Sequence, residues 1–231
     1  MNIYYIQHKK ILLIFLVILL TINNTFSQSD NVQVKNNIKN AFIFAPFGLF
    51  DILNPSLQIG YIRGINYNYS IQIEAGMIIE HSVFGMGGLH RVNRKNNSYS
   101  GYKLRLELKR RLRTNRNGMF NLFVASELFY TKNYANINDI FINSENDSYT
   151  DFFINDSHKY GFNVKMNMMF VFGSFLLEVS GGPGISYYNV EHFDRVNNND
   201  KFATDIYGYL YEEGEYFRFN LAANVRIGYI F

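Results

Sequence analysis

The sequence predicts an all-β protein, an eight-stranded antiparallel up-and-down transmembrane β-barrel. Two patterns favour this fold. Apolar and polar residues alternate in eight segments, and the connections between these segments are alternately short and long. A third observation is strand length, because several segments reach the roughly 9–11 residues that a tilted strand needs to cross a bilayer. Strands of soluble proteins are typically about five or six residues long.

The first residues of the 231-residue chain have the pattern of a signal peptide. Lys9 and Lys10 precede the apolar run Ile11–Leu20, and the polar segment Thr21–Ser27 contains small residues suited to cleavage. An apolar run of this length is too short for a membrane-spanning helix, which needs about 20 residues. We therefore expect residues 1–27 to be a signal peptide, residues 28–39 a flexible lead-in, and residues 40–231 an outer-membrane β-barrel.

The eight expected strands follow one another without a helical segment between them. The last is the clearest, since the odd-numbered residues from Phe217 to Phe231 are all apolar or aromatic, whereas Arg218, Asn220, Asn224 and Arg226 lie on the other face. The expected strands are Asn40–Phe47, Pro55–Gly64, Ser70–His81, Ser100–Leu112, Met119–Thr131, Tyr160–Phe172, Phe175–Asn189 and Tyr216–Phe231.

The connections favour a membrane barrel over a soluble one. The short links are Ile65–Tyr69, Arg113–Gly118 and Gly173–Ser174, and the long links are Ser82–Tyr99, Lys132–Lys159 and Val190–Glu215. Outer-membrane barrels have short periplasmic turns and long extracellular loops. An even number of strands then leaves both termini on the periplasmic side. Phe and Tyr near the strand ends suit aromatic girdles at the two lipid interfaces.

Alternation alone does not say which face points inward, so a soluble secreted barrel that binds an apolar ligand stays an alternative. With the apolar face toward lipid, the charged face fills a narrow lumen. Buried charges must be paired, and an eight-stranded lumen is filled by side chains, so we expect a salt-bridged interior and no ion channel. The expected interior charge network is Glu74, Glu107, Glu127, Glu178, Lys103, Arg105, Lys109, Lys165, Arg218 and Arg226.

The residue types exclude several chemistries. The chain has no Cys, so it forms no disulfide and no cysteine metal site. Loss of Lys9 and Lys10 with the signal peptide leaves 20 of the 22 basic residues against 19 acidic ones. This balance lacks the basic footprint of a nucleic-acid-binding protein. His81, His90, His158 and His192 have no metal-binding spacing, so we expect no metal and no cofactor.

An enzymatic role needs a nucleophile or base with an orienting partner. Glu80, His81 and Ser82 are the only such local set, and adjacent strand residues point to opposite faces. We therefore expect the protein not to be an enzyme. The alternative is a lipid-modifying enzyme of the outer membrane. The acidic, aromatic-containing long loops suit divalent cations or a surface protein partner. Outer-membrane lipid and lipopolysaccharide are the expected surroundings.

Several motifs resemble those of known outer-membrane proteins. The segment Asn220–Phe231 (NLAANVRIGYIF) resembles the C-terminal sorting signal of outer-membrane barrels, and TFSQ at 25–28 is similar to signal-peptide ends in Bacteroidota. PFGLFD at 46–51, PSLQIGYIRGIN at 55–66 and FLLEVSGGPGISYY at 175–188 resemble a family of uncharacterised small outer-membrane β-barrel proteins of Bacteroidota. The resemblance implies the barrel fold and a bacterial outer-membrane location, but no activity.

The sorting signal implies that the barrel-insertion machinery binds the last strand, through Phe219, Leu221, Val225, Ile227, Tyr229 and Phe231. The leading functional hypothesis is a non-enzymatic outer-membrane barrel with a role in envelope integrity or in surface interaction through its long loops.

Overall fold

The computed structural model describes residues 39–46, 56–79, 99–115, 117–142, 147–197, 200–202 and 212–231. Contacts divide the chain into two compact units, Met1–Val34 and Lys35–Phe231, and all described residues belong to the second. The expected signal peptide and nearly all of the lead-in lie outside the described residues. The same is true of Glu80, His81, Ser82 and His90.

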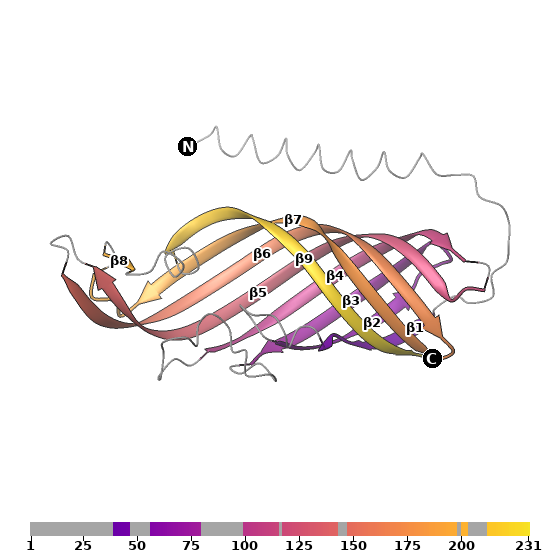
Figure 1. Cartoon of the computed structure of the whole chain (residues 1–231), viewed down its shortest axis with the longest axis horizontal. Helices are drawn as coiled ribbons and strands as arrows, with labels where there is room; N and C mark the ends of the chain where they lie inside the picture. The colour runs from indigo at the N-terminus through magenta and orange to yellow at the C-terminus, as the bar shows by residue number, and fades with distance from the viewer. Residues whose placement is uncertain are drawn as a thin grey trace, which may run out of the picture. The chain divides into compact units, whose positions relative to one another are not determined.

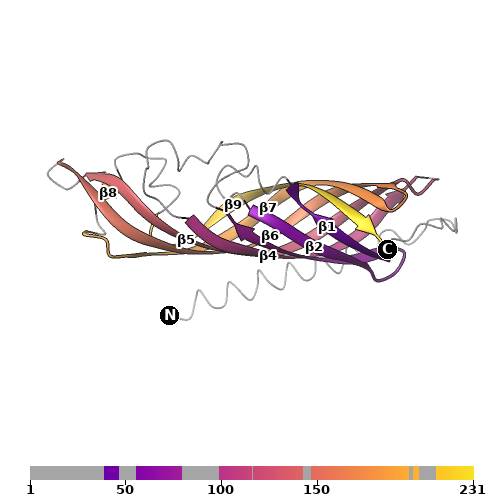
Figure 2. The same cartoon turned by 90° about the horizontal axis from the view of Figure 1, so that it is seen from below.

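The second unit is a closed antiparallel sheet (Figures 1 and 2). The chain forms β1 (Asn40–Phe44), β2 (Ser56–Gly64), β3 (Tyr69–Ile78), β4 (Tyr99–Thr114), β5 (Phe120–Ile142), β6 (Ser148–Phe172), β7 (Phe175–Phe193), β8 (Lys201–Phe202) and β9 (Gly214–Ile230). Each of the eight longer strands pairs with its neighbours in the chain. Pairing of β1 with β9, as in Ile43 opposite Gly228, completes the ring.

The prediction of an eight-stranded antiparallel up-and-down barrel is therefore confirmed. The two-residue strand β8 is an addition that the sequence did not predict, and it pairs with the far end of β5 at Phe141 and Ile142. Closure removes the free edges from the body of the sheet, so its backbone amides are paired within the barrel. In the described part of the chain, no helix combines the length and apolar character needed to cross a membrane.

The short connections lie at the end of the barrel where β9 ends (Figure 1). Gly173 and Ser174 make a two-residue turn between β6 and β7, and Gly173 has a φ of 62°, which the turn requires and Gly adopts without strain. In the β2–β3 turn the Asn66 side-chain oxygen accepts bonds from the backbone N–H groups of Asn68 and Tyr69, both at 2.9 Å. These local devices fix the register of both hairpins.

The opposite end differs from the sequence expectation. Lys132–Lys159 was expected to be a long loop, and this prediction was wrong, because β5 continues to Ile142 and β6 begins at Ser148. Pairing of β4 with β5 stops at Ala135, so residues 136–142 of β5 and 148–154 of β6 pair as a hairpin that projects beyond β4 (Figure 1). The expected Val190–Glu215 loop is also shorter, since β7 reaches Phe193 and β9 begins at Gly214. Polar residues on the outward face interrupt the apolar alternation in these strand extensions, so the sequence predicted loops there.

The two faces of the sheet are inverted relative to a soluble barrel. In β6, Asn163, Lys165 and Asn167 are buried, whereas the intervening Val164 and Met166 are exposed. Leu104, Leu106 and Leu108 of β4 are likewise exposed between inward-pointing charged residues. Alternation along a strand sends successive side chains to opposite faces, so the apolar face is on the outside of the barrel.

The lumen at the short-turn end is apolar. Buried side chains from five strands pack together there, with Ile230 of β9 against them. The cluster consists of Ala41, Ile43, Ile62, Phe123, Met169, Val171 and Leu176. It closes this end of the barrel beneath the charged interior.

Candidate functional site

The middle of the lumen contains a dense network of charged side chains. Arg226 of β9 is fully buried at its centre. One terminal nitrogen donates to Glu178 at 2.6 Å, and the other lies 2.7 Å from Glu74 and 3.3 Å from Glu107. Its distance to Glu127 is 3.8 Å. Four strands thus direct a carboxylate toward one guanidinium, whose planar group of donors suits several carboxylates at once.

Two lysines complete this network. Lys165 of β6 donates to Glu107 at 2.6 Å and to Glu127 at 2.5 Å. Lys109 of β4 contacts Glu178 and lies 3.8 Å from Glu107. None of the seven charged side chains is more than 3 % exposed. Such pairing supplies the compensation that buried charges need, and the packed side chains leave the middle of this small barrel filled.

The structure places the other three expected network residues nearer the long connections. Lys103 and Arg105 point inward from β4, and Lys103 is buried. Arg105 lies within electrostatic reach of Glu74. Arg218 of β9 pairs with Glu212 at 3.6 Å. The inward orientation of these residues was expected. The charged residues of the lumen nevertheless fall into two zones: the central network, and an upper zone nearer the long connections.

Lys159 of β6 belongs to the upper zone and was not among the residues expected there. Its Nζ donates to the Asn220 side chain at 3.2 Å, and Asn220 donates to Asn163 at 2.6 Å. Asn163 in turn donates to Glu127 at 2.6 Å. A chain of hydrogen bonds therefore joins the upper zone to the central network. Strand alternation would have found Lys159 if β6 had been extended beyond Tyr160.

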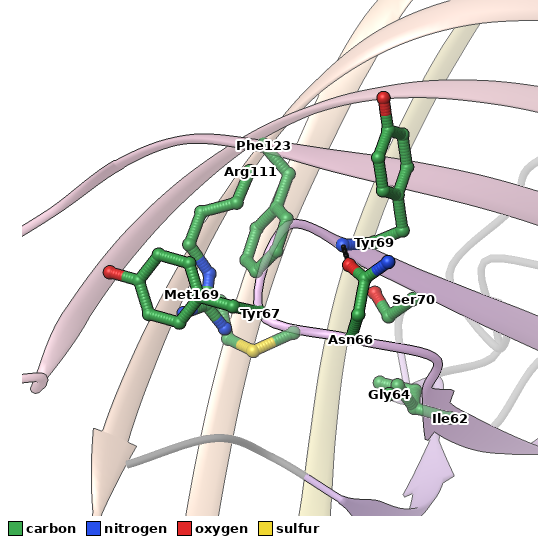
Figure 3. A pocket seen from close by; sticks show the side chains of 9 residues that line it. All are labelled: Ile62, Gly64, Asn66, Tyr67, Tyr69, Ser70, Arg111, Phe123 and Met169. Atoms are coloured by element: carbon green, nitrogen blue, oxygen red, sulfur yellow. Dashed lines mark hydrogen bonds between the residues drawn. The ribbon is translucent and has the colours of Figure 1, made fainter. Parts of the chain in front are cut away.

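A small cavity lies at the short-turn end (Figure 3). Its volume is about 10 Å³, which is close to the minimum that holds a single water molecule. Figure 3 shows Arg111 beside Tyr67 and Phe123, and its guanidinium carbon is 4.5 Å and 5.5 Å from the centres of those rings. This cavity is too small for a substrate, and Arg111 serves there as a packed cation above aromatic rings.

Aromatic side chains form a row around the outward face near the long connections. Neighbouring ring centres are 5.7 Å apart for Tyr102 and Tyr130, 4.9 Å for Tyr130 and Tyr160, 6.4 Å for Tyr160 and Tyr187, and 5.1 Å for Tyr187 and Phe217. The row crosses β4, β5, β6, β7 and β9 without a break. We call these five residues the upper girdle.

A second group of aromatic side chains lies at the short-turn end. Phe42 stacks on Phe231 with ring centres 5.1 Å apart and lies 5.8 Å from Tyr61, and Phe175 is 5.9 Å from Tyr229. These five residues are the lower girdle. Between the girdles, the outward positions of β3, β6, β7 and β9 carry no Lys, Arg, Asp or Glu. The outer surface is thus an apolar band with an aromatic border at each end.

Polar side chains begin immediately beyond the upper girdle. The Tyr130 hydroxyl is 2.9 Å from His158 Nδ1, and His158 Nε2 is 3.5 Å from Asp156, which also pairs with Lys132 at 3.3 Å. A carboxylate, an imidazole and a hydroxyl in sequence have the residue types of a catalytic triad. The 3.5 Å separation is longer than a hydrogen bond that orients a catalytic imidazole. The set is better described as the polar border of the apolar band.

The projecting hairpin has a core of its own. Ala135, Ile137, Phe141 and Phe153 are buried together, with Tyr149 packed against them. Arg195, from the connection after β7, lies with its guanidinium carbon 4.5 Å above the Phe141 ring. This aromatic packing explains why polar segments on both sides of the turn stay in strand conformation.

Hydrogen bonds hold the connection after β7 against this hairpin. The Val196 backbone N–H donates to Asp151 at 3.0 Å, and the Tyr149 hydroxyl donates to Asp200 at 2.8 Å. Partial burial and the hydrogen bond to Asp200 raise the pKa of Tyr149 to about 12. Burial lowers the pKa of Arg195, opposed by nearby acidic groups, Glu213 foremost. The acidic loop residues at this end therefore include structural partners.

Two of the four histidines of the mature chain lie among the described residues. Of the four mature-chain histidines, His158 lies in the polar border and His192 packs against Phe153, with ring centres 4.6 Å apart. His81 and His90 lie outside the described residues. Within the described ranges, no group of three or more His, Asp or Glu side chains is arranged to hold a metal ion.

The C-terminal strand has the alternation that the sequence predicted. Phe219, Leu221, Ile227, Tyr229 and Phe231 are exposed on the outward face, and Val225 is partly exposed. β9 pairs with β7 on one side and with β1 on the other. The backbone N–H of Phe231 donates to Asn40 at 3.0 Å. The last strand therefore forms one side of the seam at which the barrel closes.

Comparisons with known proteins give one structural likeness. No protein-family model matches the chain, and no curated protein matches it. Among solved structures, the chain is similar to a major outer membrane protein from Thermus thermophilus, with 8 % sequence identity and a TM-score of 0.41. The likeness covers 83 % of this chain and 97 % of that one. At this level of similarity we draw no functional conclusion from it.

Proposed function

We propose that this protein is a non-enzymatic β-barrel of the bacterial outer membrane that presents its long-connection end to the cell exterior. The observation that carries the proposal is the inverted barrel, with a charged interior and an apolar outer band bordered by two aromatic girdles. So much exposed apolar surface is unfavourable in water. The same surface is favourable in contact with lipid, and a closed sheet leaves no unpaired backbone groups within the membrane.

The height of the apolar band fits a membrane. On β6 the chain advances from Tyr160 in the upper girdle to Phe172 at the short-turn end. At about 3.3 Å per residue and a tilt of about 45°, this segment rises about 28 Å. The apolar band of outer-membrane barrels is about 25 Å tall. The same geometry disfavours the soluble barrel with an apolar ligand, because the lumen is charged.

Cell fractionation tests the location. The full-length chain is expressed in a Gram-negative host, and the inner and outer membranes are separated by density and washed with alkaline carbonate. We expect the protein to stay in the outer membrane after the wash. We also expect the folded barrel to migrate differently in detergent gels from the same sample after heating. Recovery from the soluble periplasm would contradict the proposal.

Export and insertion form part of the same proposal. Residues 1–27 would direct export, and the C-terminal strand would be bound by the barrel-insertion machinery. Removal of Phe231 is expected to lower the inserted fraction more strongly than Phe217→Ala, a change to an outward aromatic residue at the other end of β9. Equal insertion of both variants would contradict a sorting role for the C-terminal residue.

The projecting hairpin is the part of the molecule best suited to surface interaction. Ile140 and Phe152 are exposed on its outward side, beyond the polar border, and Phe193 is exposed beside it at the end of β7. Exposed apolar groups in water favour binding to another molecule. We infer that the barrel acts as an anchor and that this end makes contact with a partner or contributes to envelope integrity.

A register-preserving deletion tests the hairpin. Ala135 lies opposite Asn155, so a two-residue Asn-Gly turn in place of residues 136–154 keeps the β5–β6 pairing below it. The protein is extracted from outer membranes, and co-purifying components and envelope sensitivity to bile salts are compared. We expect a component or an envelope phenotype to be lost with the hairpin and with Phe152→Ser, but kept in the control Thr150→Ser. Identical results for all variants would overturn the interaction role.

A further inference from the structure

Charge is distributed unevenly between the two ends of the barrel. Every Asp and Glu in the described part of the chain lies either in the central network or at the long-connection end. The described Lys and Arg residues of the short-turn end are Lys39, Arg63, Arg110, Arg111 and Arg113. The short-turn end is therefore basic. The proposed function places this end in the periplasm, and the inference below rests on that proposal.

Arg63 points out of the barrel wall just beyond the lower girdle. It follows the buried Ile62 on β2, and its own side chain is exposed. It comes two residues after Tyr61 of the lower girdle, which is about 7 Å further along the strand. Since successive residues of a strand face opposite ways, Arg63 and Tyr61 share the outer face. An outward side chain just beyond the aromatic border of an apolar band lies among lipid headgroups.

An irregularity in β4 sends Arg113 to the same outer face. The register of β4 on β5 shifts between Arg111, which lies opposite the buried Phe123, and Arg113. Arg113 lies opposite Leu122, the neighbouring residue of β5, which is on the outer face. In a regular strand residues two apart share a face, so Arg113 would have pointed inward with Arg111. A β-bulge redirects a side chain in this way, and Arg113 is exposed at the end of β4.

The two outward arginines stand on one side of the barrel, on β2 and β4 with β3 between them. We call Arg63 and Arg113 the lower arginine pair. At the same end of β6, β7 and β9 the outward residues are the aromatic Phe172, Phe175 and Phe231. Aromatic residues suit the interface of any bilayer, whereas exposed guanidinium groups select for negative charge. The β2–β4 side of the short-turn end is thus distinguished by its chemistry.

We propose that the lower arginine pair binds the phosphate groups of anionic phospholipids in the periplasmic leaflet. A guanidinium donates two parallel, charge-assisted hydrogen bonds to phosphate oxygens, and its apolar stem packs along the apolar band. The described residues place no Asp or Glu side chain at this end to compete with lipid for Arg63 or Arg113. Basic side chains at a membrane surface attract anionic lipids.

Lipid selectivity of the extracted barrel tests the proposal. The folded protein in non-ionic detergent is mixed with equal amounts of phosphatidylglycerol and phosphatidylcholine that carry the same acyl chains, and the retained lipids are measured by native mass spectrometry. We expect the native barrel to retain at least about fivefold more phosphatidylglycerol, since each cation near an anionic lipid surface contributes roughly this factor.

Substitutions of the lower arginine pair locate the selectivity. Arg63→Gln/Arg113→Gln is expected to lose the preference for phosphatidylglycerol, whereas Arg63→Lys/Arg113→Lys keeps both charges and should keep most of it. The control Lys132→Gln removes an outward cation at the other end, where Lys132 is paired with Asp156 at 3.3 Å, and should behave like the native protein. Both arginines are exposed, so the variants are expected to fold, and heat-dependent migration in detergent gels checks this.

Equal retention of the two lipids by the native barrel would overturn the proposal, as would an unchanged preference in Arg63→Gln/Arg113→Gln. Displacement of phosphatidylglycerol by excess soluble glycerol phosphate would also overturn it, because the site would then bind free phosphate. Each single substitution gives the same comparison if the double variant does not fold. A barrel that fractionates with the outer membrane but lacks lipid selectivity contradicts this inference alone, so its failure is distinguishable from failure of the proposed function.

Discussion

Arg226 is the residue on which the interior network depends most. The substitution Arg226→Met keeps a long side chain in the lumen but removes the guanidinium that contacts Glu74, Glu107 and Glu178 at 2.6–3.3 Å. Lys109 and Lys165 then remain against four buried carboxylates. Removing one partner of a buried ion pair lowers the folding stability by about 3–5 kcal/mol. Because Arg226 serves several carboxylates, we expect a loss of about 4 kcal/mol, or roughly a thousandfold in the folding equilibrium.

Denaturant unfolding in lipid vesicles, followed by circular dichroism, measures this loss. A matched variant, Arg226→Met/Glu178→Gln, removes one of the carboxylates left without its guanidinium and should recover part of the stability. The reasoning would be refuted by an Arg226→Met protein that unfolds within about 1 kcal/mol of the native protein. It would also be refuted if the second substitution lowered stability further by a similar amount.

Three further predictions concern the outer band, the strand packing and the hairpin. Leu106→Arg places a charge on the apolar band and should destabilise the barrel in vesicles by about 2–4 kcal/mol; an effect below about 1 kcal/mol would place this position outside the hydrocarbon. Gly182→Ala should prevent folding or shift β7, since an added Cβ would lie 2.0 Å from the Val164 oxygen, and a native-like folded fraction would contradict this. The raised pKa of Tyr149 means that its contribution to holding the loop is complete below pH 10 and is lost as pH rises toward 12. Tyrosinate absorbance, compared between the native protein and Tyr149→Phe, measures the pKa of this side chain. Loop release below about pH 9 would contradict the stated direction.

The sequence predicted the barrel body because its signal is strong and local. Apolar and charged residues alternate in β4 from Tyr102 to Lys109, and apolar and polar residues alternate in β6 from Phe162 to Met168. The turn at Gly173 and Ser174 has the length that a hairpin requires. Alternation also assigned all ten expected charged residues to the inward face. These features depend on neighbours in the chain, so a single sequence reveals them.

The hairpin extension could not be predicted from alternation alone. Asn136 and Asn138 make the outward face of β5 polar where it leaves the apolar band, which resembles a loop. The buried Ile137 and Phe141 stabilise this segment by packing on Phe153, a contact between strands that only the fold brings together. The division of the charged lumen into a central network and a second zone nearer the long connections has the same cause. It depends on the stagger between strands, which sets the height of Lys159 relative to Arg226.

Single-cysteine labelling tests the central claim, that the outer apolar band lies in lipid and the hairpin lies in water, most directly. The chain has no Cys, so Leu106→Cys and Ile140→Cys each introduce a unique reactive group. Intact cells are treated with a membrane-impermeant maleimide, and the label is measured before and after denaturation. The account predicts labelling of Ile140→Cys in intact cells and of Leu106→Cys only after denaturation. Rapid labelling of Leu106→Cys in folded protein, or protection of Ile140→Cys in intact cells, would contradict it.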